Sequence, residues 1–499
     1  MDWKCGYVGF SFLRWLHYST EKRKVNEENF LKFPIIKNEN HLASSKKVCY
    51  NKAVSVLERR QPMNRNKKIS LSKYRVTPRT VPAGETSTVT ICPMGEGLRF
   101  DDATEYLVRI VPMEAYPQTA ILEKPIAFDR LSIYPKDGCL SVTYTFRQEQ
   151  EWVISVTNEE REEKKKPPLE FRVYSLLPDL YERNPYRGDF HAHSTGSDGN
   201  EDPLIVAANY RKEGYDFFAL TDHHAYDPSD RMVKAYEGVP CGLKMFRGEE
   251  VHLRGWIHIV NFGSRYSVND LYHRDEERIH AELLAEAEKT ETPENVNPLE
   301  YCYRKWIYDQ IKKAGGMTIL PHPHWIHKPG VHNMNTKMLE YSFRMGLQDA
   351  FELTGGQTVH ENNLQIAFWQ DMRAEGVKVP IVGSSDSHGT DPAMYFYMSK
   401  TVLFAKDMEF DSIRDAIKDG YSVAIEEQYG EQPHVHGPYR LVKYVRFLMD
   451  EYFPGHDELC VEEGRLMREF SLGDPDAKDA LCALAGRTDR YRERTLRGR

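Results

Sequence analysis

The chain has 499 residues, of which 40 % are hydrophobic and 28 % charged, and its 67 Lys and Arg against 75 Asp and Glu give a formal net charge of −8. This length gives room for about two to four domains, and the composition excludes a disordered or collagen-like protein. The mild acidity provides no overall attraction to nucleic acid, and no apolar run is long enough to span a bilayer, so neither is expected as a partner.

Residues 1–75 are predicted to form a poorly patterned N-terminal extension, because they show no sustained hydrophobic periodicity. Their apolar start is interrupted by Arg14 and His17 and has no small-residue cleavage site, which argues against a signal peptide. The eight cysteines are scattered without a Cys-x-x-Cys pair, as expected of free thiols in a reducing compartment. We therefore expect a soluble, cytoplasmic protein.

Residues 76–180 are predicted to form a small antiparallel β-sandwich of immunoglobulin-like type. Short β-rich runs that alternate apolar and polar residues are separated by turn sequences such as Lys136-Asp137-Gly138. The expected strands are 87–91, 106–111, 140–146, 152–156 and 171–176. For the charged run from Glu159 to Pro168, a solvated hairpin tip is favoured over a binding patch.

Residues 181–430 alternate apolar strand-like runs with helix-like stretches, which is typical of an α/β protein with a parallel sheet or barrel. A charged, helix-favouring insertion at about 265–310 could act as a cap. Residues 431–499 are predicted to be helical and to end in an Arg-rich tail, for which a solvated end is favoured. A chain that ends near residue 485 is therefore expected to keep its activity.

Polar residues gather where the predicted strands of residues 181–430 end, and loops at such ends build the active sites of barrels. The first strand ends in Asp189-Phe190-His191-Ala192-His193. Because residues two apart in an extended chain point to the same side, His191 and His193 can bind one cation. Taken alone, such a pair is a weak indication of a metal.

Asp198 follows the same first strand, where alone it would be a turn residue, and further candidates accompany the later strands. These are Asp222, His223, Glu250, His258, His322, Asp386 and His388, with His252 and Glu249 as weaker competitors for the roles of His258 and Glu250. Glu249 and Glu250 point to opposite faces of an extended chain, and we predict that Glu250 reaches the metals and that replacing Glu249 is mild. Each motif alone could be a core histidine or a capped turn, but five at successive strand ends predict a multinuclear metal site.

The ordered motifs DFHAHSTGSDG, ALTDHH, GEEV followed by WIHIV, LPHP and GSSDSH resemble those of the PHP (polymerase and histidinol phosphatase) superfamily, over about residues 186–425. A β-rich segment directly before them is similar to the arrangement in the CehA/McbA-like metallohydrolase branch. The resemblance implies a distorted (β/α)7 barrel that holds two or three divalent transition metal ions, which would be Zn, Mn or Fe.

The resemblance also implies how the ligands are shared among the ions. One ion would be bound by His191, His193 and Asp386, with Glu250 bridging; a second by Glu250, His258 and His322; and a third by Asp198, His223 and His388. All nine positions carry residues able to bind a metal. This favours an enzyme over a non-catalytic binding module.

Metal ions that activate a water molecule and polarise the scissile bond require no Ser or Cys nucleophile. We predict Asp222, Glu250 and Asp386 as the catalytic carboxylates, although a supporting structural role is favoured for Asp222. Candidate contacts for an anionic small-molecule substrate are Arg254, His324, His327 and Lys328.

The leading functional hypothesis is a hydrolase of a small phosphate mono- or diester, since that is the activity the resemblance most often implies. A carbamate, carboxyl ester or amide hydrolase is the alternative that the CehA/McbA-like arrangement implies. A nuclease is less favoured, because the sequence has no basic stripe with interleaved aromatic residues. The sequence leaves a homo-oligomer open.

Overall fold

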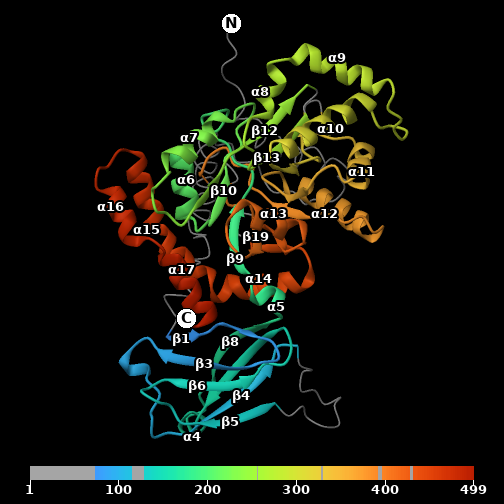
Figure 1. Cartoon of the computed structure of the whole chain (residues 1–499). Coiled ribbons are helices and arrows are strands. Elements are labelled where there is room, and N and C mark those ends of the chain that lie inside the picture. Colours follow the sequence, from blue (N-terminus) through green and yellow to red (C-terminus); the bar gives the residue numbers. More distant parts are fainter. Residues whose placement is uncertain (1–72, 115–127, 255–256, 328–329, 392–395, 428–430) are drawn as a thin grey trace, which may run out of the picture. The chain divides into compact units, whose positions relative to one another are not determined.

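The computed structural model describes residues 73–114, 128–254, 257–327, 330–391, 396–427 and 431–499 (Figure 1). All of them belong to the second of two compact units, residues 62–499. The predicted N-terminal extension therefore lies almost entirely outside the described residues. Among the described helices, none combines the length and the apolar character needed to cross a membrane.

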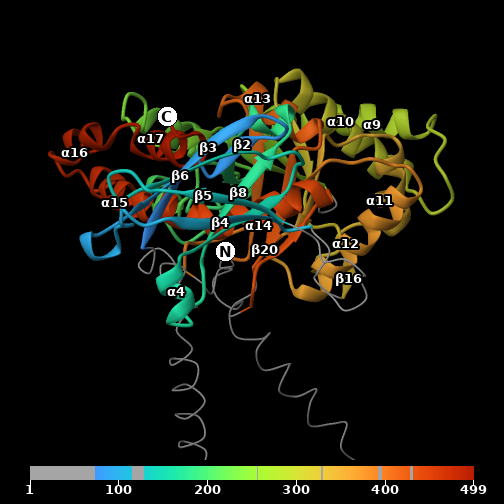
Figure 2. The same ribbon diagram turned by 90° about the horizontal axis from the view of Figure 1, so that it is seen from below.

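The first described region consists of two β-sheets that share one apolar core (Figures 1 and 2). One sheet has the order β1 (Tyr74–Thr77), β3 (Thr86–Pro93) and β6 (Leu140–Thr145). The other has the order β2 (Thr80–Pro82), β8 (Leu169–Leu176), β7 (Glu151–Thr157), β4 (Tyr106–Pro112) and β5 (Asp129–Ile133). All paired strands are antiparallel except β2 and β8, and a short 3-10 helix, η1 (Glu96–Leu98), follows β3. Each of the five predicted strands is present, and β1, β2 and β5 are additional.

One expectation for this region is wrong. Cys92 at the end of β3 and Cys139 before β6 form a disulfide, so these two are not free thiols, whereas Cys241, Cys302, Cys460 and Cys482 are. The pairing of β3 with β6 brings the two cysteines together although they are 47 residues apart in sequence. A disulfide is rare in a reducing compartment, so the cysteines no longer support a cytoplasmic location.

The charged run lies at the exposed tip of the antiparallel β7–β8 hairpin, as favoured, and it includes a short helix, α4 (Glu159–Glu163). The side chain of Asn158 accepts a hydrogen bond from the backbone N–H of Arg161 and so caps the start of this helix. Acidic residues in the first turn favour the helix further, because the N-terminus carries a partial positive charge.

The second region contains two mixed sheets. A six-stranded sheet has the order β11 (Lys244–Phe246), β10 (Phe217–Ala219), β9 (Asn184–Asp189), β19 (Ser399–Ala405), β20 (Ser422–Glu426) and β21 (His434–His436). A five-stranded sheet has the order β12 (Gly248–Leu253), β13 (Ile257–Phe262), β14 (Met317–Leu320), β17 (Ala350–Thr354) and β18 (Ile381–Gly383). Strands β9 to β11 are parallel, as are β14, β17 and β18, but β13 is antiparallel to both neighbours and β19 to β9.

Both sheets are therefore mixed instead of parallel throughout, and the length of one connection explains the antiparallel pair of β12 and β13. Only residues 254–256 separate β12 from β13. A parallel pair needs a crossover of a dozen or more residues, so two strands joined this closely must be antiparallel.

The two sheets are joined to one another at one end by isolated backbone bridges. His223, just beyond β10, pairs with Glu250 in β12, and Ala192, just beyond β9, pairs with Ser387, just beyond β18. Hydrogen bonds from Glu250 N to Thr221 O (3.0 Å) and from His193 N to Ser387 O (2.8 Å) fix both junctions. Seven strands, β9, β10, β12, β13, β14, β17 and β18, are thus linked in a ring at the end where β9 and β10 finish.

Helices flank the two sheets, and some of these helices make up the predicted insertion (Figure 1). The helices and short strands between β8 and β21 are α5 (Pro178–Tyr181), α6 (Pro203–Lys212), α7 (Asp227–Ala235), α8 (Val268–His273), α9 (Glu276–Ala287), α10 (Pro298–Lys313), β15 (Ile326–His327), β16 (Val331–His332), α11 (Thr336–Arg344), α12 (Val359–Ala374) and α13 (Phe410–Lys418). The insertion predicted at about 265–310 contains α8, α9 and most of α10. α8 packs on β12 and α10 on β13, while α9 packs on α10, and the apolar cluster in which they take part includes Val251, Ile259 and Ile307.

The C-terminal residues are helical, as predicted, but their end is not solvated. The elements are α14 (Tyr439–Glu451), α15 (Phe453–Ser471), α16 (Ala477–Leu484), α17 (Arg487–Arg492) and a π-helix, η3 (Glu493–Arg497). Leu496 is fully buried, and its carbonyl accepts a hydrogen bond of 2.7 Å from the hydroxyl of Thr80 in β2. Arg497 donates to Thr80 Oγ1 and to the carbonyl of Arg183, both at 2.9 Å.

Arginine in this tail serves packing as well as solubility. The guanidinium of Arg492 lies 5.1 Å from the ring centroid of Tyr186, and that of Arg497 lies 4.3 Å from that of Tyr181. Such cation–π contacts allow a charged side chain to cover an aromatic surface. A chain that ends near residue 485 would lose these contacts. The expectation that the tail is dispensable assumed a solvated end, and the structure does not support that assumption.

We predict that Leu496→Ala lowers the free energy of unfolding by about 2–5 kcal/mol, because it leaves a cavity at a buried contact with the sandwich. Urea denaturation of the full chain would measure the change. Leu472→Ala is the matched control, since Leu472 is 74 % exposed, and should cost less than about 0.5 kcal/mol. Equal stabilities of the two variants would contradict the packing of the tail.

Candidate metal centre

All nine predicted ligands lie at the end of the sheets where the two bridges occur. His191 and His193 follow β9, His223 follows β10 and His322 follows β14. Asp386 and His388 follow β18, and Asp198 lies in the loop after His193. Glu250 is inside β12, and His258 comes from the start of β13. His258 reaches the same edge because β13 is antiparallel, so its N-terminal end lies beside the C-terminal end of β12.

The carboxylate of Glu250 is the centre of this group and is fully buried. Its Oε1 lies 2.8 Å from His258 Nδ1 and 3.1 Å from His322 Nε2. Its Oε2 lies 2.7 Å from His223 Nδ1 and 3.3 Å from His191 Nε2. Burial would raise the pKa of Glu250, but the facing His258, His223 and His191 hold it well below its usual value. Glu250 is therefore a buried anion in contact with four histidines.

A second set of contacts surrounds His193. Asp386 Oδ1 lies 3.1 Å from His193 Nε2 and 3.3 Å from His191 Nε2. Asp198 Oδ1 lies 3.3 Å from His388 Nε2 and 3.9 Å from His193 Nδ1. Burial disfavours the charged form of His388, but the facing Asp198 and Asp386 raise its pKa to about 9. Burial lowers the pKa of His193 to about 4, assisted by the nearby His388 and His223.

These residues fit divalent cations. Four groups have ligand atoms that all lie within 4.8 Å of one another: His191, His193 and Asp386; His191, Glu250 and His322; His223, Glu250 and His258; and His193, Asp198, His223 and His388. The groups share members, as expected of ions that share bridging ligands. Sets of imidazole and carboxylate suit Zn, Mn and Fe alike.

Two buried atoms support the same conclusion. His191 Nε2 and Glu250 Oε2 are 3.3 Å apart, yet neither makes a hydrogen bond of acceptable geometry within the described structure. Buried polar atoms without hydrogen bonds are costly, and a cation bound by both atoms would satisfy them.

The backbone at this edge is strained. Three of the six described non-glycine residues with positive φ angles lie here: His224, His322 and Asp386, at 56°, 27° and 50°. Such conformations cost on the order of 1 kcal/mol each for residues with a Cβ, and they persist where the surroundings fix them. They follow β10, β14 and β18, and two of the three, His322 and Asp386, belong to the ligand groups.

Two carboxylates that the sequence analysis did not single out support the ligands. Glu352 in β17 accepts a hydrogen bond at 3.0 Å from His191 Nδ1, which leaves the Nε2 atom of that ring for the ligand groups. Asp189 accepts from the backbone N–H of His191 at 3.1 Å and of Ser385 at 3.0 Å. The sequence contains one indication of this role: Glu352 is a charged residue inside the buried run Ala350–Thr354, and a buried charge needs a partner.

Asp222 and Glu249 lie in supporting positions. Asp222 accepts hydrogen bonds from the backbone and hydroxyl of Ser194 and from the hydroxyl of Ser197, so it holds the loop that carries Asp198. This geometry favours the structural role over the catalytic one. Glu249 accepts from Asn261, Ser267, Val268 and Asn269, and thereby fastens the start of α8 to β12. Glu250, and not Glu249, faces the histidines, which matches the expected register.

The predicted substrate contacts are less well placed. Arg254 forms ion pairs with Glu276 (2.8 Å) and Glu277 (3.3 Å) of α9. Its charge is therefore neutralised by residues that do not belong to the ligand groups. His324 is buried and packs beside His332, with ring centroids 5.2 Å apart. The side chain of His327 and all of Lys328 lie outside the described residues. Trp325 contacts the centre, because its ring lies 5.7 Å from that of His322 and 5.9 Å from that of His258.

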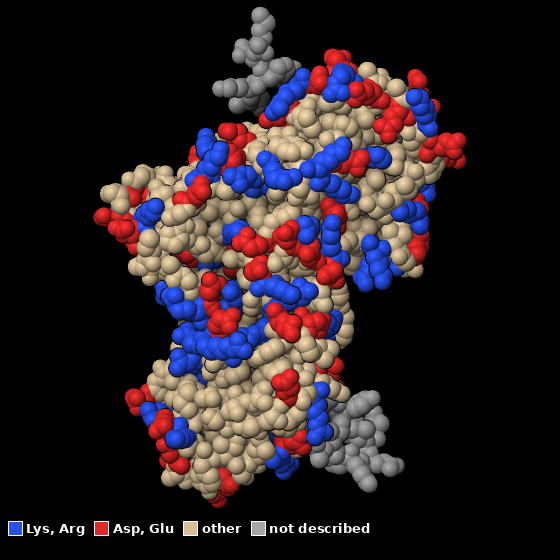
Figure 3. Space-filling view, viewed as in Figure 1, with Lys and Arg blue, Asp and Glu red and all other residues tan. Residues whose placement is uncertain are grey.

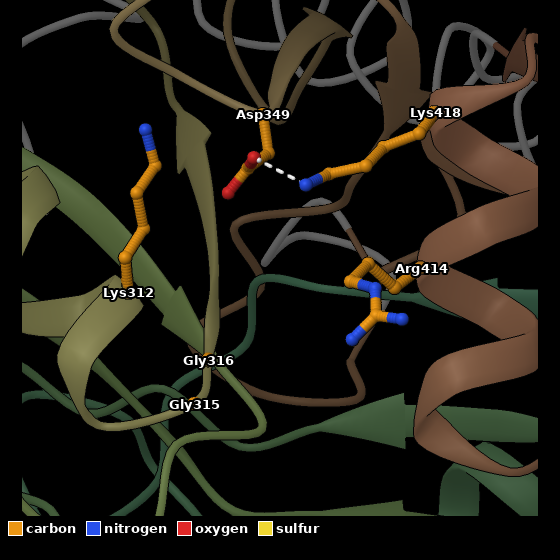
Figure 4. A pocket seen from close by; sticks show the side chains of 6 residues that line it. All are labelled: Lys312, Gly315, Gly316, Asp349, Arg414 and Lys418. Carbon is orange, nitrogen blue, oxygen red and sulfur yellow. Dashed lines mark ion pairs between the residues drawn. The ribbon is translucent and has the colours of Figure 1, made fainter.

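A separate hollow of ≈ 240 Å³ lies near the starts of β14 and β17, at the opposite end of these strands (Figure 4). Lys312, Gly315, Gly316, Asp349, Arg414 and Lys418 line it. Lys418 pairs with Asp349 at 2.9 Å, and Lys312 donates to the carbonyl of Leu347. This hollow contains none of the candidate ligands.

No protein-family model and no curated protein matches the chain. Among solved structures, a two-domain protein from Bacteroides vulgatus that contains a predicted PHP-like metal-dependent phosphoesterase is 19 % identical, with a TM-score of 0.36 over 50 % of this chain and 67 % of that one. A candidate metal-dependent phosphoesterase from Bifidobacterium adolescentis is 17 % identical, with a TM-score of 0.29 over 41 % and 88 % of the respective chains. An amidohydrolase from Chromobacterium violaceum is also 17 % identical, with a TM-score of 0.27 over 42 % and 89 %. These scores are too low to carry a functional argument, so the function must be inferred from the residues of the site.

We predict that Glu250→Gln and Glu249→Gln have opposite effects. Glu250→Gln should lower the metal content measured by elemental analysis, because it removes the anion that four histidines face. Glu249→Gln should keep the metal but lower the free energy of unfolding by about 1–3 kcal/mol, because its amide group would oppose buried donors. We therefore keep the expectation of a mild effect of Glu249→Gln for metal binding alone.

The matched control for both variants is Glu277→Gln, because the side chain of Glu277 is 89 % exposed. It should change neither metal content nor stability. Loss of metal in Glu249→Gln with retention in Glu250→Gln would show that the assignment of the two faces is reversed.

Proposed function

We propose that the protein is a metal-dependent hydrolase that uses a metal-activated water molecule, and that its substrate is a small phosphate mono- or diester. The observation that carries the proposal is the buried Glu250 carboxylate, which lies within 3.3 Å of four histidine nitrogens. Glu250 belongs to two of the ligand groups, and each of its oxygens contacts one histidine of each group, so the carboxylate lies between them as a bridging ligand would. As part of the same proposal, the second region is a distorted (β/α)7 barrel, the first is an immunoglobulin-like sandwich, and the protein belongs to the CehA/McbA-like branch.

Ions held by the nine ligands would lower the pKa of a bound water toward neutrality and polarise the phosphoryl oxygen. The chain itself supplies the orientation of the ligands. Glu352 fixes the ring of His191, and Asp222 fixes the loop of Asp198. Trp325 covers His258 and His322 from one side with an apolar ring. No Ser or Cys nucleophile is needed for this chemistry.

The phosphate preference is supported by the choice of ligands. Of the nine candidates, six are neutral imidazoles when bound to a metal and three are carboxylates. Two or three divalent ions would therefore leave a site of net positive charge, which favours an anionic substrate. Acidic and basic side chains are interspersed on the face shown in Figure 3, which offers no extended basic stripe for a nucleic acid there.

A parallel assay tests the proposal. The Mn- and Zn-loaded full chain would be given an aryl phosphate, a bis-aryl phosphate, an aryl carbamate and an aryl ester. We expect one of the two phosphates to be turned over fastest, and we expect His193→Ala to lower that rate by about two orders of magnitude or more, since it removes a ligand.

His360→Ala is the control for this assay, because His360 is exposed on α12 and belongs to none of the ligand groups. Faster turnover of the carbamate or the ester would establish the alternative hydrolase. No turnover of any substrate by protein shown to contain metal would contradict the proposal.

A further inference from the structure

A second group of possible metal ligands lies on the hairpin of β20 and β21, apart from the centre described above. It consists of Glu426 at the end of β20 and His434 and His436 in β21. None of the three belongs to the groups around Glu250. β21 is the edge strand of its sheet, and α14 follows it in the chain.

The register of the hairpin places the three side chains on one face. Glu426 is directly opposite His434 in the antiparallel pair of β20 and β21. His436 is two residues further along β21, so it points to the same face as His434. The candidate ligand atoms of the three residues all lie within 4.8 Å of one another.

The environment of Glu426 suits a metal ligand. Glu426 is buried, and Asn362 of α12 donates to its Oε1 at 3.0 Å, which fixes the carboxylate. That amide also donates to Gly355 O and accepts from Gly355 N, so its orientation is itself fixed. Amides and carboxylates that orient the first ligands of a metal in this way are common around protein metal sites.

A second observation points to a ligand at this place. His436 Nε2 is buried and makes no hydrogen bond with any described residue, and it lies 4.0 Å from Glu426 Oε2. That distance is too long for a hydrogen bond. Two ligands bound at about 2.1 Å to a tetrahedral ion are about 3.4 Å apart, so a small rotation of the exposed His434 and of His436 would bring all three onto one ion.

We propose that Glu426, His434 and His436 form an additional site for one divalent transition ion of the zinc class. Two imidazoles and one carboxylate leave a fourth position open to water. The ion would fasten the short edge strand β21 to β20 and, through Asn362, to α12. The site does not depend on the hydrolase function proposed above, because it shares no ligand with that centre.

Zinc binding by the full chain tests this proposal. Equilibrium dialysis at micromolar free Zn²⁺, followed by elemental analysis, would give the number of ions per chain. We expect His434→Ala to bind one equivalent less than the unchanged protein, because the exposed His434 can be removed without disturbing a core. His434→Cys should keep that equivalent, since a thiolate also binds zinc. His360→Ala is the matched exposed control and should bind as many ions as the unchanged protein.

The two metal sites are distinguished by a variant of the other centre. His191→Ala should lose ions from that centre but keep the equivalent that His434→Ala loses. The combined variant should lose both. Equal zinc content of His434→Ala and the unchanged protein would overturn the additional site, whatever the outcome for His191→Ala.

Discussion

The buried negative charge of Glu250 is the constraint on which the second region of the structure depends. A carboxylate without exposure to water is stable only where positive or polar groups meet it, and here four histidines from four strands do so. These histidines must lie at the same level, three of them after the ends of β9, β10 and β14 and His258 at the start of β13, which fixes the register of the four strands. The bridge between His223 and Glu250 joins the two sheets at that level. The same contact therefore closes the ring of strands and brings these two ligands together.

The adjacent pair Glu249 and Glu250 shows how one short strand serves two purposes. Successive side chains of β12 point to opposite faces, so one carboxylate joins the ligand groups while the other binds the start of α8. The position of the helical insertion and the position of the central ligand are therefore tied through neighbouring residues. The antiparallel turn into β13 then returns the chain to the same edge, where His258 completes the contacts of Glu250.

Much of the site could be predicted from the sequence, because its residues follow apolar runs at spacings that place side chains on one face. The strands of the sandwich with clear alternation were predictable too. By contrast, β2 has only three residues and includes Pro82, and β5 is largely exposed, so neither carries a strong pattern. The partner of Cys92 and the partners of Thr495, Leu496 and Arg497 are set by contacts between distant segments, which no local pattern contains. The supporting role of Asp222 follows from the hydrogen bonds that it accepts from Ser194 and Ser197, and sequence spacing does not reveal these bonds.

The contact of Thr80 with Leu496 joins residues 416 positions apart and has a consequence for the order in which the protein folds. A ribosome delivers β2 long before the π-helix, so the edge of the sandwich beside Thr80 stays uncovered while the residues between them are made. Domains generally fold as units as they emerge, and exposed strand edges invite pairing with other chains. The apolar core of the sandwich can thus form during translation before the C-terminal residues cover its β2 edge. A chaperone would be most useful to the chain during that interval.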